Sequence, residues 1–247
     1  MKKIIWIDVG THLAQEYNSV FKGNSWFFIK IIRTILSCIV RRNYFIGFKT
    51  IYSIYILRKK LQKYKSNFRV AFIEANPLHF RHKEYYLADD TFCLALADKS
   101  SDDFKIGLLY FANSDSKSQG NSIYTSKSNI SESDFLLTSI VSAEAFTKSY
   151  KILLDSTYKD YEVIVRMNCE GSEDSVIYAF TKHFGDKFNH VFGSLKDVKD
   201  IKGEASYSRL MNHLQLNKIK FTNFSSMIDT WHEAHKEILK IASNSKK

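Results

Sequence analysis

Lys-Ile-Ile-Trp-Ile-Asp-Val-Gly, residues 3–10, is an apolar run that ends in an acid and a glycine. Such a run is typical of a buried strand that turns into a helix. Two later stretches are similar: Arg-Val-Ala-Phe-Ile-Glu at 69–74 and Tyr-Glu-Val-Ile-Val-Arg-Met at 161–167. Strands that are apolar along their whole length are typical of a parallel sheet with helices on both faces.

The rest of the chain alternates between the two kinds of element. Further strands are expected at 91–97, 104–111, 189–193 and 218–224. Helices are expected at 12–66, 78–87, 142–156, 172–184, 204–216 and 227–242, and a serine-rich loop at 112–133. This order predicts one α/β domain over 1–247, with a Rossmann-like, doubly wound and mostly parallel sheet.

Residues 17–68 form a basic insertion after the first strand. No acid occurs from 17 to 73, whereas the chain as a whole carries a net charge of +10. The bases in this stretch are Lys22, Lys30, Arg33, Arg41, Arg42, Lys49, Arg58, Lys59, Lys60, Lys63, Lys65 and Arg69. Apolar runs punctuated by bases predict helices that either cover the sheet with their bases in water or meet an acidic partner or membrane surface.

Composition excludes several classes of protein. Aromatic residues make up 15% of the chain, which is far from the composition of a disordered chain. No uninterrupted apolar run is long enough for a transmembrane segment. The three cysteines, Cys38, Cys93 and Cys169, are odd in number and widely spaced, so we expect neither disulfides nor a zinc site. A cytoplasmic location is expected, and a position on the inner face of a membrane stays open as an alternative.

The strand ends carry the residues that could bind a ligand. In a doubly wound sheet, ligands bind beyond the carboxyl ends of the strands, where the strand order reverses. Gly10 allows close backbone approach there, and Glu74 is suited to accept hydrogen bonds from ribose hydroxyls. Residues 168–171, Asn-Cys-Glu-Gly, follow another strand. The dinucleotide fingerprint is absent, because His12 and Gln15 occupy its later glycine positions.

Four motifs in order resemble those of the FkbM-type S-adenosylmethionine-dependent methyltransferases. They are Ile-Asp-Val-Gly-Thr-His-Leu-Ala-Gln-Glu at 7–16, Phe-Ile-Glu-Ala-Asn-Pro at 72–77, Leu-Ala-Leu-Ala-Asp at 94–98, and Val-Arg-Met-Asn-Cys-Glu-Gly-Ser-Glu at 165–173. The family typically shows Asp-Val-Gly-Ala-Asn-x-Gly, Glu-Pro-x-Pro and Lys-Ile-Asp-x-Glu-Gly-x-Glu. The resemblance implies a class I methyltransferase fold and methyl transfer from S-adenosylmethionine to oxygen.

The resemblance also implies roles for individual residues. The cofactor-binding candidates are Asp8, Gly10, Thr11, His12, Gln15, Glu74 and Asp98, with Glu74 on the ribose and Asp98 near the adenine. The catalytic candidates are Glu170, His12 and Asn168, with Glu170 as the first choice for the base that accepts the acceptor's proton. The sequence departs from the family pattern at Ala14, which replaces a glycine, and at Asn168, which replaces an aspartate. No metal is expected, because Asn168 breaks the carboxylate cluster.

The predicted function is therefore O-methylation of a sugar, glycan or small metabolite. Two alternatives stay open at this point. The basic insertion and its aromatic residues could grip nucleic acid in a nucleic-acid methyltransferase. Alternatively, Asn168 and Ala14 could belong to a protein that binds the cofactor with little turnover.

Overall fold

A computed structural model describes residues 2–21, 27–29, 31–32, 34–36, 44–98, 103–112, 120–225 and 227–245. Cys38 and five of the bases in the basic insertion (Lys22, Lys30, Arg33, Arg41 and Arg42) lie outside these ranges.

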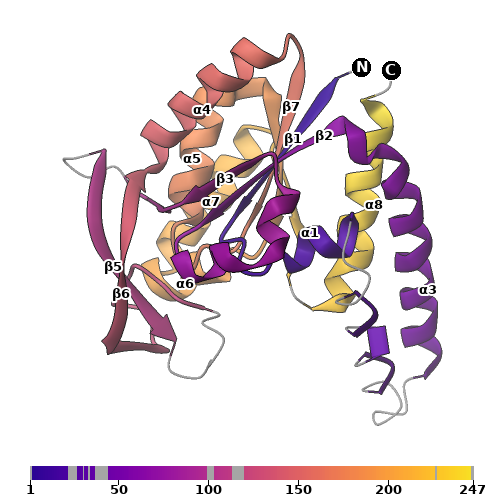
Figure 1. Cartoon of the computed structure of the whole chain (residues 1–247), viewed down its shortest axis with the longest axis horizontal. Helices are drawn as coiled ribbons and strands as arrows, with labels where there is room; N and C mark the ends of the chain where they lie inside the picture. The colour runs from indigo at the N-terminus through magenta and orange to yellow at the C-terminus, as the bar shows by residue number, and fades with distance from the viewer. Residues whose placement is uncertain are drawn as a thin grey trace.

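The main sheet has six strands whose neighbours are all parallel (Figure 1). They are β1 (Lys3–Val9), β2 (Phe68–Glu74), β3 (Asp90–Cys93), β7 (Tyr161–Met167), β8 (Phe188–Gly193) and β9 (Lys220–Asn223), in the order β3-β2-β1-β7-β8-β9. Counted within the sheet, this order is 3-2-1-4-5-6, which is compatible with a Rossmann-like fold. The predicted parallel α/β sheet is thus confirmed, and its strand order reverses between β1 and β7.

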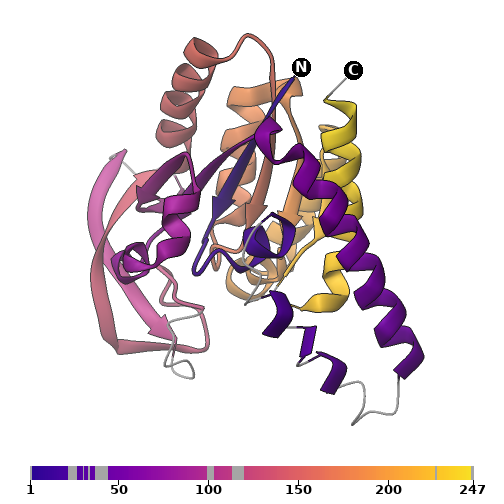
Figure 2. The same ribbon diagram turned by 45° about the vertical axis from the view of Figure 1, so that its right-hand side comes forward.

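Helices cover both faces of this sheet. One core cluster joins α4 (Ala143–Thr157), α5 (Glu173–Phe184) and α7 (Glu204–Leu216) to the sheet. The other joins α1 (Gln15–Val20), α3 (Tyr44–Leu61) and α8 (Ile228–Asn244) to the opposite face, and Figure 2 shows α3 running alongside α8. Side chains of β1 alternate between the clusters: Ile5 and Ile7 face the first, whereas Ile4 and Trp6 face the second.

Shorter helical elements include η1 (Gln62–Asn67), η2 (Pro77–Arg81), η3 (Lys83–Leu87), η4 (Gly185–Lys187) and α6 (Lys196–Lys202), and the described residues among 27–36 are helical as well. The helix expected at 78–87 is therefore a pair of 3₁₀ turns, and α6 has no counterpart among the predicted elements.

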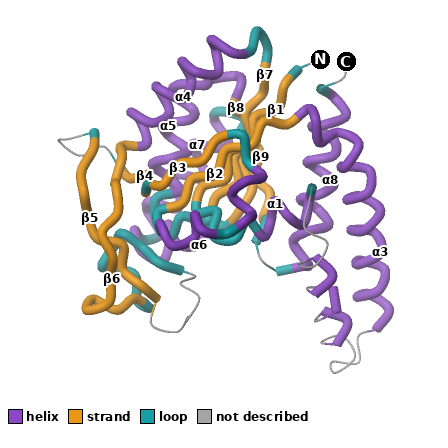
Figure 3. The backbone as a smooth tube through the Cα atoms, in the orientation of Figure 1, coloured by secondary structure: helices purple, strands orange, loops and turns teal. Residues whose placement is uncertain are grey.

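A second, three-stranded sheet stands beside the β3 edge (Figure 3). It contains β4 (Ala95–Ala97), β5 (Phe104–Ala112) and β6 (Ile130–Ser142), with β5 and β6 antiparallel. Two predictions are wrong here. The expected strand 91–97 is two strands, because the chain leaves the main sheet at Leu94, and β6 begins inside the predicted loop 112–133. The expected strand 104–111 is confirmed as β5, but it lies in the second sheet.

The described part of the basic insertion packs on the protein's own body. Ile54 and Leu61 of α3 are fully buried. Arg58 is also buried, with its guanidinium 4.4 Å from the ring centroid of Phe27. Lys49, Lys59 and Lys60 are exposed. None of the described helices is long and apolar enough to cross a membrane.

Candidate functional site

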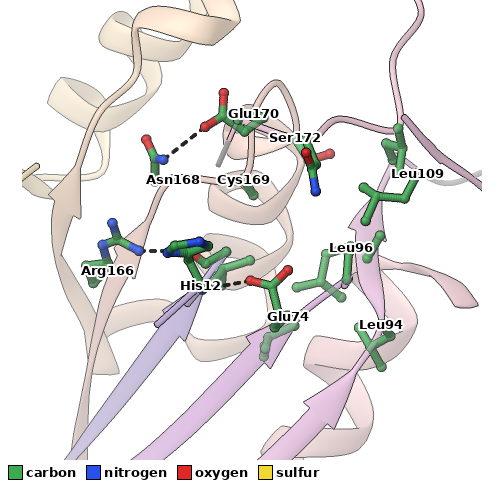
Figure 4. Close-up of a pocket in the computed structure, with 18 of the residues that line it drawn as sticks. His12, Glu74, Leu94, Leu96, Leu109, Arg166, Asn168, Cys169, Glu170 and Ser172 are labelled. Carbon is green, nitrogen blue, oxygen red and sulfur yellow. Dashed lines mark hydrogen bonds between the residues drawn. The ribbon is translucent and has the colours of Figure 1, made fainter. Parts of the chain in front are cut away.

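A cavity of about 220 Å³ lies at the carboxyl ends of the strands, where the strand order reverses. Figure 4 shows side chains from β2, the β1 turn, the segment after β7 and the second sheet converging on it. Six of the predicted site residues line it: Gly10, His12, Gln15, Glu74, Asn168 and Glu170. This is the position where the doubly wound order predicts a ligand site.

The turn after β1 brings two backbone segments into close contact. Gly10 has a φ of 71°, and a Cβ atom there would lie 2.1 Å from the carbonyl oxygen of Asn168. Glycine is thus required by the close contact with the backbone at Asn168 as well as by the conformation of the turn. The next turn residues, His12 and Ala14, also have positive φ, at 50° and 51°. The structure therefore accommodates Ala14, where the family motif has a glycine, in a left-handed conformation.

Glu74 at the end of β2 is held in place by two backbone amides. The His12 N–H donates to its Oε2 at 2.7 Å, and the Asn76 N–H donates to its Oε1 at 2.8 Å. Figure 4 shows the carboxylate projecting toward the cavity. Burial raises the pKa of Glu74, while the two amide hydrogen bonds lower it. The carboxylate is thus oriented by one hydrogen bond on each oxygen and can accept further ones.

Asp8 does not line the cavity, contrary to its predicted place beside the cofactor. It is fully buried, and its Oδ1 accepts a hydrogen bond from Arg166 Nη1 at 3.0 Å. The same guanidinium pairs with Glu16 through Nη2 at 3.0 Å and donates to the Gly10 carbonyl at 2.9 Å. Burial raises the pKa of Asp8 to about 6, although Arg166 opposes that shift. Asp8 therefore holds Arg166, which lines the cavity and is hydrogen-bonded to Gly10.

Thr11 and Asp98 also lie outside the cavity lining. The Thr11 hydroxyl is buried and donates to the Asp8 carbonyl at 2.7 Å. Asp98 follows β4, and its carboxylate accepts hydrogen bonds from Ser175 and Lys202. The chain has already left the main sheet at this point, so Asp98 is carried away from the strand ends. An apolar wall occupies the adjacent part of the cavity, formed by Leu94, Leu96, Leu109 and Ile123.

Glu170 sits in a polar network on the opposite side of the cavity. Its Oε2 forms an ion pair with Lys127, and its Oε1 accepts a hydrogen bond from Asn168 Nδ2 at 3.0 Å. Burial raises the pKa of Glu170; the neighbouring Asp197 raises it further, whereas Lys127 lowers it. The Glu170 carboxylate and the Asn168 amide are thus joined, and Lys127 completes the group.

A second glutamate shapes the segment that presents Glu170. Glu173 is fully buried and accepts hydrogen bonds from the backbone N–H groups of Cys169 at 3.0 Å and Gly171 at 2.9 Å. Burial raises the pKa of Glu173 to about 7. Glu170 itself has a φ of 56°, so this segment is a tight, left-handed turn. Burial also raises the pKa of the Cys169 thiol well above its usual range, as expected of a packing residue.

His12 contributes through its backbone as well as its ring. Its carbonyl accepts a hydrogen bond from Tyr85 Oη at 2.7 Å, and its ring centroid lies 4.4 Å from that of His79. Burial lowers the pKa of His79 to about 4, so this partner ring is neutral at neutral pH. Within the described part of the chain, no group of histidine, cysteine and acidic side chains could hold a metal ion.

Sequence reasoning missed Arg166 and Lys127. Arg166 interrupts the apolar strand 161–167, and a charge in such a strand requires a buried partner, which is a signal that the sequence does contain. Lys127 lies in the serine-rich stretch and offers no comparable signal. The segment around it reaches the site because Ser122 Oγ donates to the Glu170 carbonyl at 2.8 Å and Ser172 Oγ to Tyr124 Oη at 3.2 Å.

Comparison of the chain with protein-family models, with curated proteins and with solved structures finds no match.

Proposed function

We propose that the cavity binds S-adenosylmethionine and that the protein transfers its methyl group to a hydroxyl oxygen of a sugar, glycan or small metabolite. The observation that carries this proposal is Glu74, a buried carboxylate at the end of β2, oriented by two amides toward the cavity. In nucleotide-binding sheets of this order, an acid near the strand ends accepts hydrogen bonds from ribose hydroxyls.

The other walls of the cavity suit the remaining parts of the ligand. Leu94 and Leu96 offer an apolar surface for the adenine ring. The turn at Gly10 and His12 lies beside Glu74, where the methionine part would extend. The turn lacks the glycines that a pyrophosphate needs, which favours S-adenosylmethionine over a dinucleotide.

Glu170 is the proposed base. The bound cofactor would supply a methyl group activated by a positive sulfur, so alignment and exclusion of water are the main tasks of the protein. The Glu170 carboxylate would accept the proton of the acceptor hydroxyl as the methyl group moves from the cofactor's sulfur to that oxygen. A raised pKa brings this carboxylate closer to the range in which it can hold that proton.

Methyl transfer from isotopically labelled S-adenosylmethionine to a panel of hydroxyl acceptors tests this proposal. We expect Glu170→Gln to lower kcat by about 10²–10⁴-fold while leaving cofactor binding unchanged, because only proton removal is lost. Glu132→Gln, at an exposed position on β6, is the matched control. A wild-type rate in Glu170→Gln would exclude Glu170 as the base.

One observation favours a second candidate function, binding of the cofactor with little turnover. Both oxygens of Glu170 are already engaged, one by Lys127 and one by Asn168. In that case S-adenosylmethionine binds, and no acceptor in the panel becomes labelled. The same assay, run beside a binding measurement, separates the two functions.

A further inference from the structure

The basic insertion exposes one apolar helix face. The described residues among 27–36 are helical, and Phe28, Ile29, Ile32 and Leu36 are 47%, 47%, 56% and 56% exposed. Helical spacing places these four on one side. Phe27 and Ile31, on the other side, are buried in the core cluster shared with α8. Phe27 and Ile31 therefore anchor these described residues to the protein, and the other four present an apolar surface.

Exposed bases and tyrosines follow in the next two elements of the insertion. Along α3 and η1 the exposed side chains include Lys49, Tyr52, Tyr55, Lys59, Lys60, Lys63 and Lys65. Among the described residues, none of these five lysines forms an ion pair, and the whole stretch from 17 to 73 contains no acid. The positive charge is thus uncompensated within the insertion.

We propose that the basic insertion docks the protein on the surface of an anionic lipid bilayer. Helices with an apolar face and neighbouring lysines lie in the interfacial plane, with the apolar side chains at the boundary between headgroups and acyl chains. Exposed tyrosines suit the same depth, because their rings are apolar and their hydroxyls polar. The docking is peripheral, since no described helix could cross the bilayer.

Charge distinguishes this face from a second exposed apolar patch. Phe104, Ile106, Phe135 and Leu137 on β5 and β6 are 56%, 58%, 47% and 66% exposed. The exposed charged residues at 103–106 and 132–137 are three acids, Asp103, Glu132 and Asp134, and one base, Lys105, so their net charge is negative and an anionic surface repels them. Charge complementarity therefore selects the basic insertion as the lipid-facing side.

Co-sedimentation of the full chain with vesicles tests the proposal. We expect binding to equimolar phosphatidylcholine and phosphatidylserine, weak binding to phosphatidylcholine alone, and loss of binding as salt rises. The double variant Lys59→Glu/Lys60→Glu should weaken binding by at least about 25-fold, since each base near such a surface contributes about fivefold. Ile32→Ser/Leu36→Ser should weaken it as well, because the apolar contact with the acyl chains is lost.

Matched controls use exposed positions on the other side of the molecule. Lys105→Glu/Lys148→Glu repeats the charge change on β5 and α4, and Ile106→Ser/Leu137→Ser repeats the apolar change; both should bind vesicles as the wild type does. Thermal unfolding of every variant confirms that it is folded. The proposal is overturned if the wild type binds neither vesicle, if controls and insertion variants lose binding equally, or if the insertion binds only nucleic acid or a second copy of the chain. None of these outcomes bears on cofactor binding, so the two proposals fail separately.

Discussion

At the scale of single residues, Gly10 shows how tightly the turn after β1 is constrained. A methyl group there would meet the Asn168 carbonyl oxygen at 2.1 Å and would also disfavour the φ of 71°. We expect Gly10→Ala to lower the free energy of unfolding by about 2–4 kcal/mol, measured by urea denaturation. Gly203→Ala is the control, because that glycine has a φ of 85° but open space around it. Equal losses in both variants would show that the contact with Asn168 is unimportant.

Lys127 offers a test of the base through its effect on Glu170. The ammonium lowers the pKa of Glu170, so Lys127→Met should raise that pKa. Because the base acts when deprotonated, the acid limb of the pH profile of kcat/KM should move to higher pH. Lys105→Met, at an exposed position on β5, should leave the profile unchanged. An acid limb that does not move would contradict the assignment of Glu170.

Some of the site residues predicted from the sequence line the cavity, and others do not. Glu74, Gly10 and Glu170 line one cavity because strands that end in polar residues deliver those residues to one edge of a parallel sheet. Asp8 and Asp98 occupy similar places in the sequence but are drawn to Arg166 and to Ser175 and Lys202. Such pairings depend on distant segments and cannot be read from local pattern.

At the scale of elements, Arg166 joins β7 to β1 and α1. Replacing it by leucine leaves the buried carboxylates of Asp8 and Glu16 without their cation, and we expect a loss of about 3–5 kcal/mol of stability. Lys182→Leu, which removes an exposed ion pair with Glu144, should cost less than about 1 kcal/mol.

The loss in Arg166→Leu should depend on pH. Without the guanidinium, the pKa of Asp8 rises beyond its present value of about 6, so the folded state takes up protons that the unfolded state does not. A raised carboxyl pKa contributes stability at low pH that is lost as pH rises. Urea denaturation at about pH 5 and about pH 8 should therefore show the larger deficit at the higher pH. A deficit independent of pH would argue against a buried, unpaired Asp8.

The sequence predicts a strand correctly where the strand is buried along its length and reads as a continuous apolar run. Strands 3–9 and 161–167 match β1 and β7 because all but one position of each strand is buried. β6 escaped prediction because its inward positions include Thr138 and Ser142, whereas Phe135 and Leu137 face outward. The apolar alternation that marks a half-buried strand is therefore absent.

At the scale of the whole molecule, buried histidines make stability depend on pH. Burial lowers the pKa of His79, His190 and His235 to about 4 each. In the unfolded state the histidine pKa values are near 6.5, so between about pH 6.5 and about pH 4 the unfolded state binds more protons than the folded state. Stability therefore falls as the pH decreases through this range. Asp8 and Glu173, whose pKa values are raised to about 6 and about 7, act in the opposite sense.

A variant at His235 tests the contribution of one buried histidine to this pH dependence. Its ring lies between the carbonyls of Ser19, at 3.0 Å, and Trp231, at 2.7 Å, and so joins α8 to α1. We expect His235→Gln to lower the free energy of unfolding at neutral pH. The further loss of stability as the pH decreases from about 6.5 to about 4 should be smaller in this variant than in the wild type. His232→Gln, at a half-buried position on the same helix, should retain the wild-type pH dependence. If His235→Gln retained it too, protonation of His235 would not contribute to acid unfolding.

The proposed function depends on a nucleoside ligand at Glu74. Isothermal titration calorimetry with S-adenosylmethionine and with S-adenosylhomocysteine measures that directly, on the wild type, Glu74→Gln and the exposed control Glu132→Gln, each verified as folded. The proposal predicts saturable binding of both ligands to the wild type and to Glu132→Gln, and affinity at least about tenfold weaker in Glu74→Gln, because hydrogen bonds to a charged acceptor are lost. Failure of both ligands to bind the wild type, or undiminished affinity in Glu74→Gln, would contradict it.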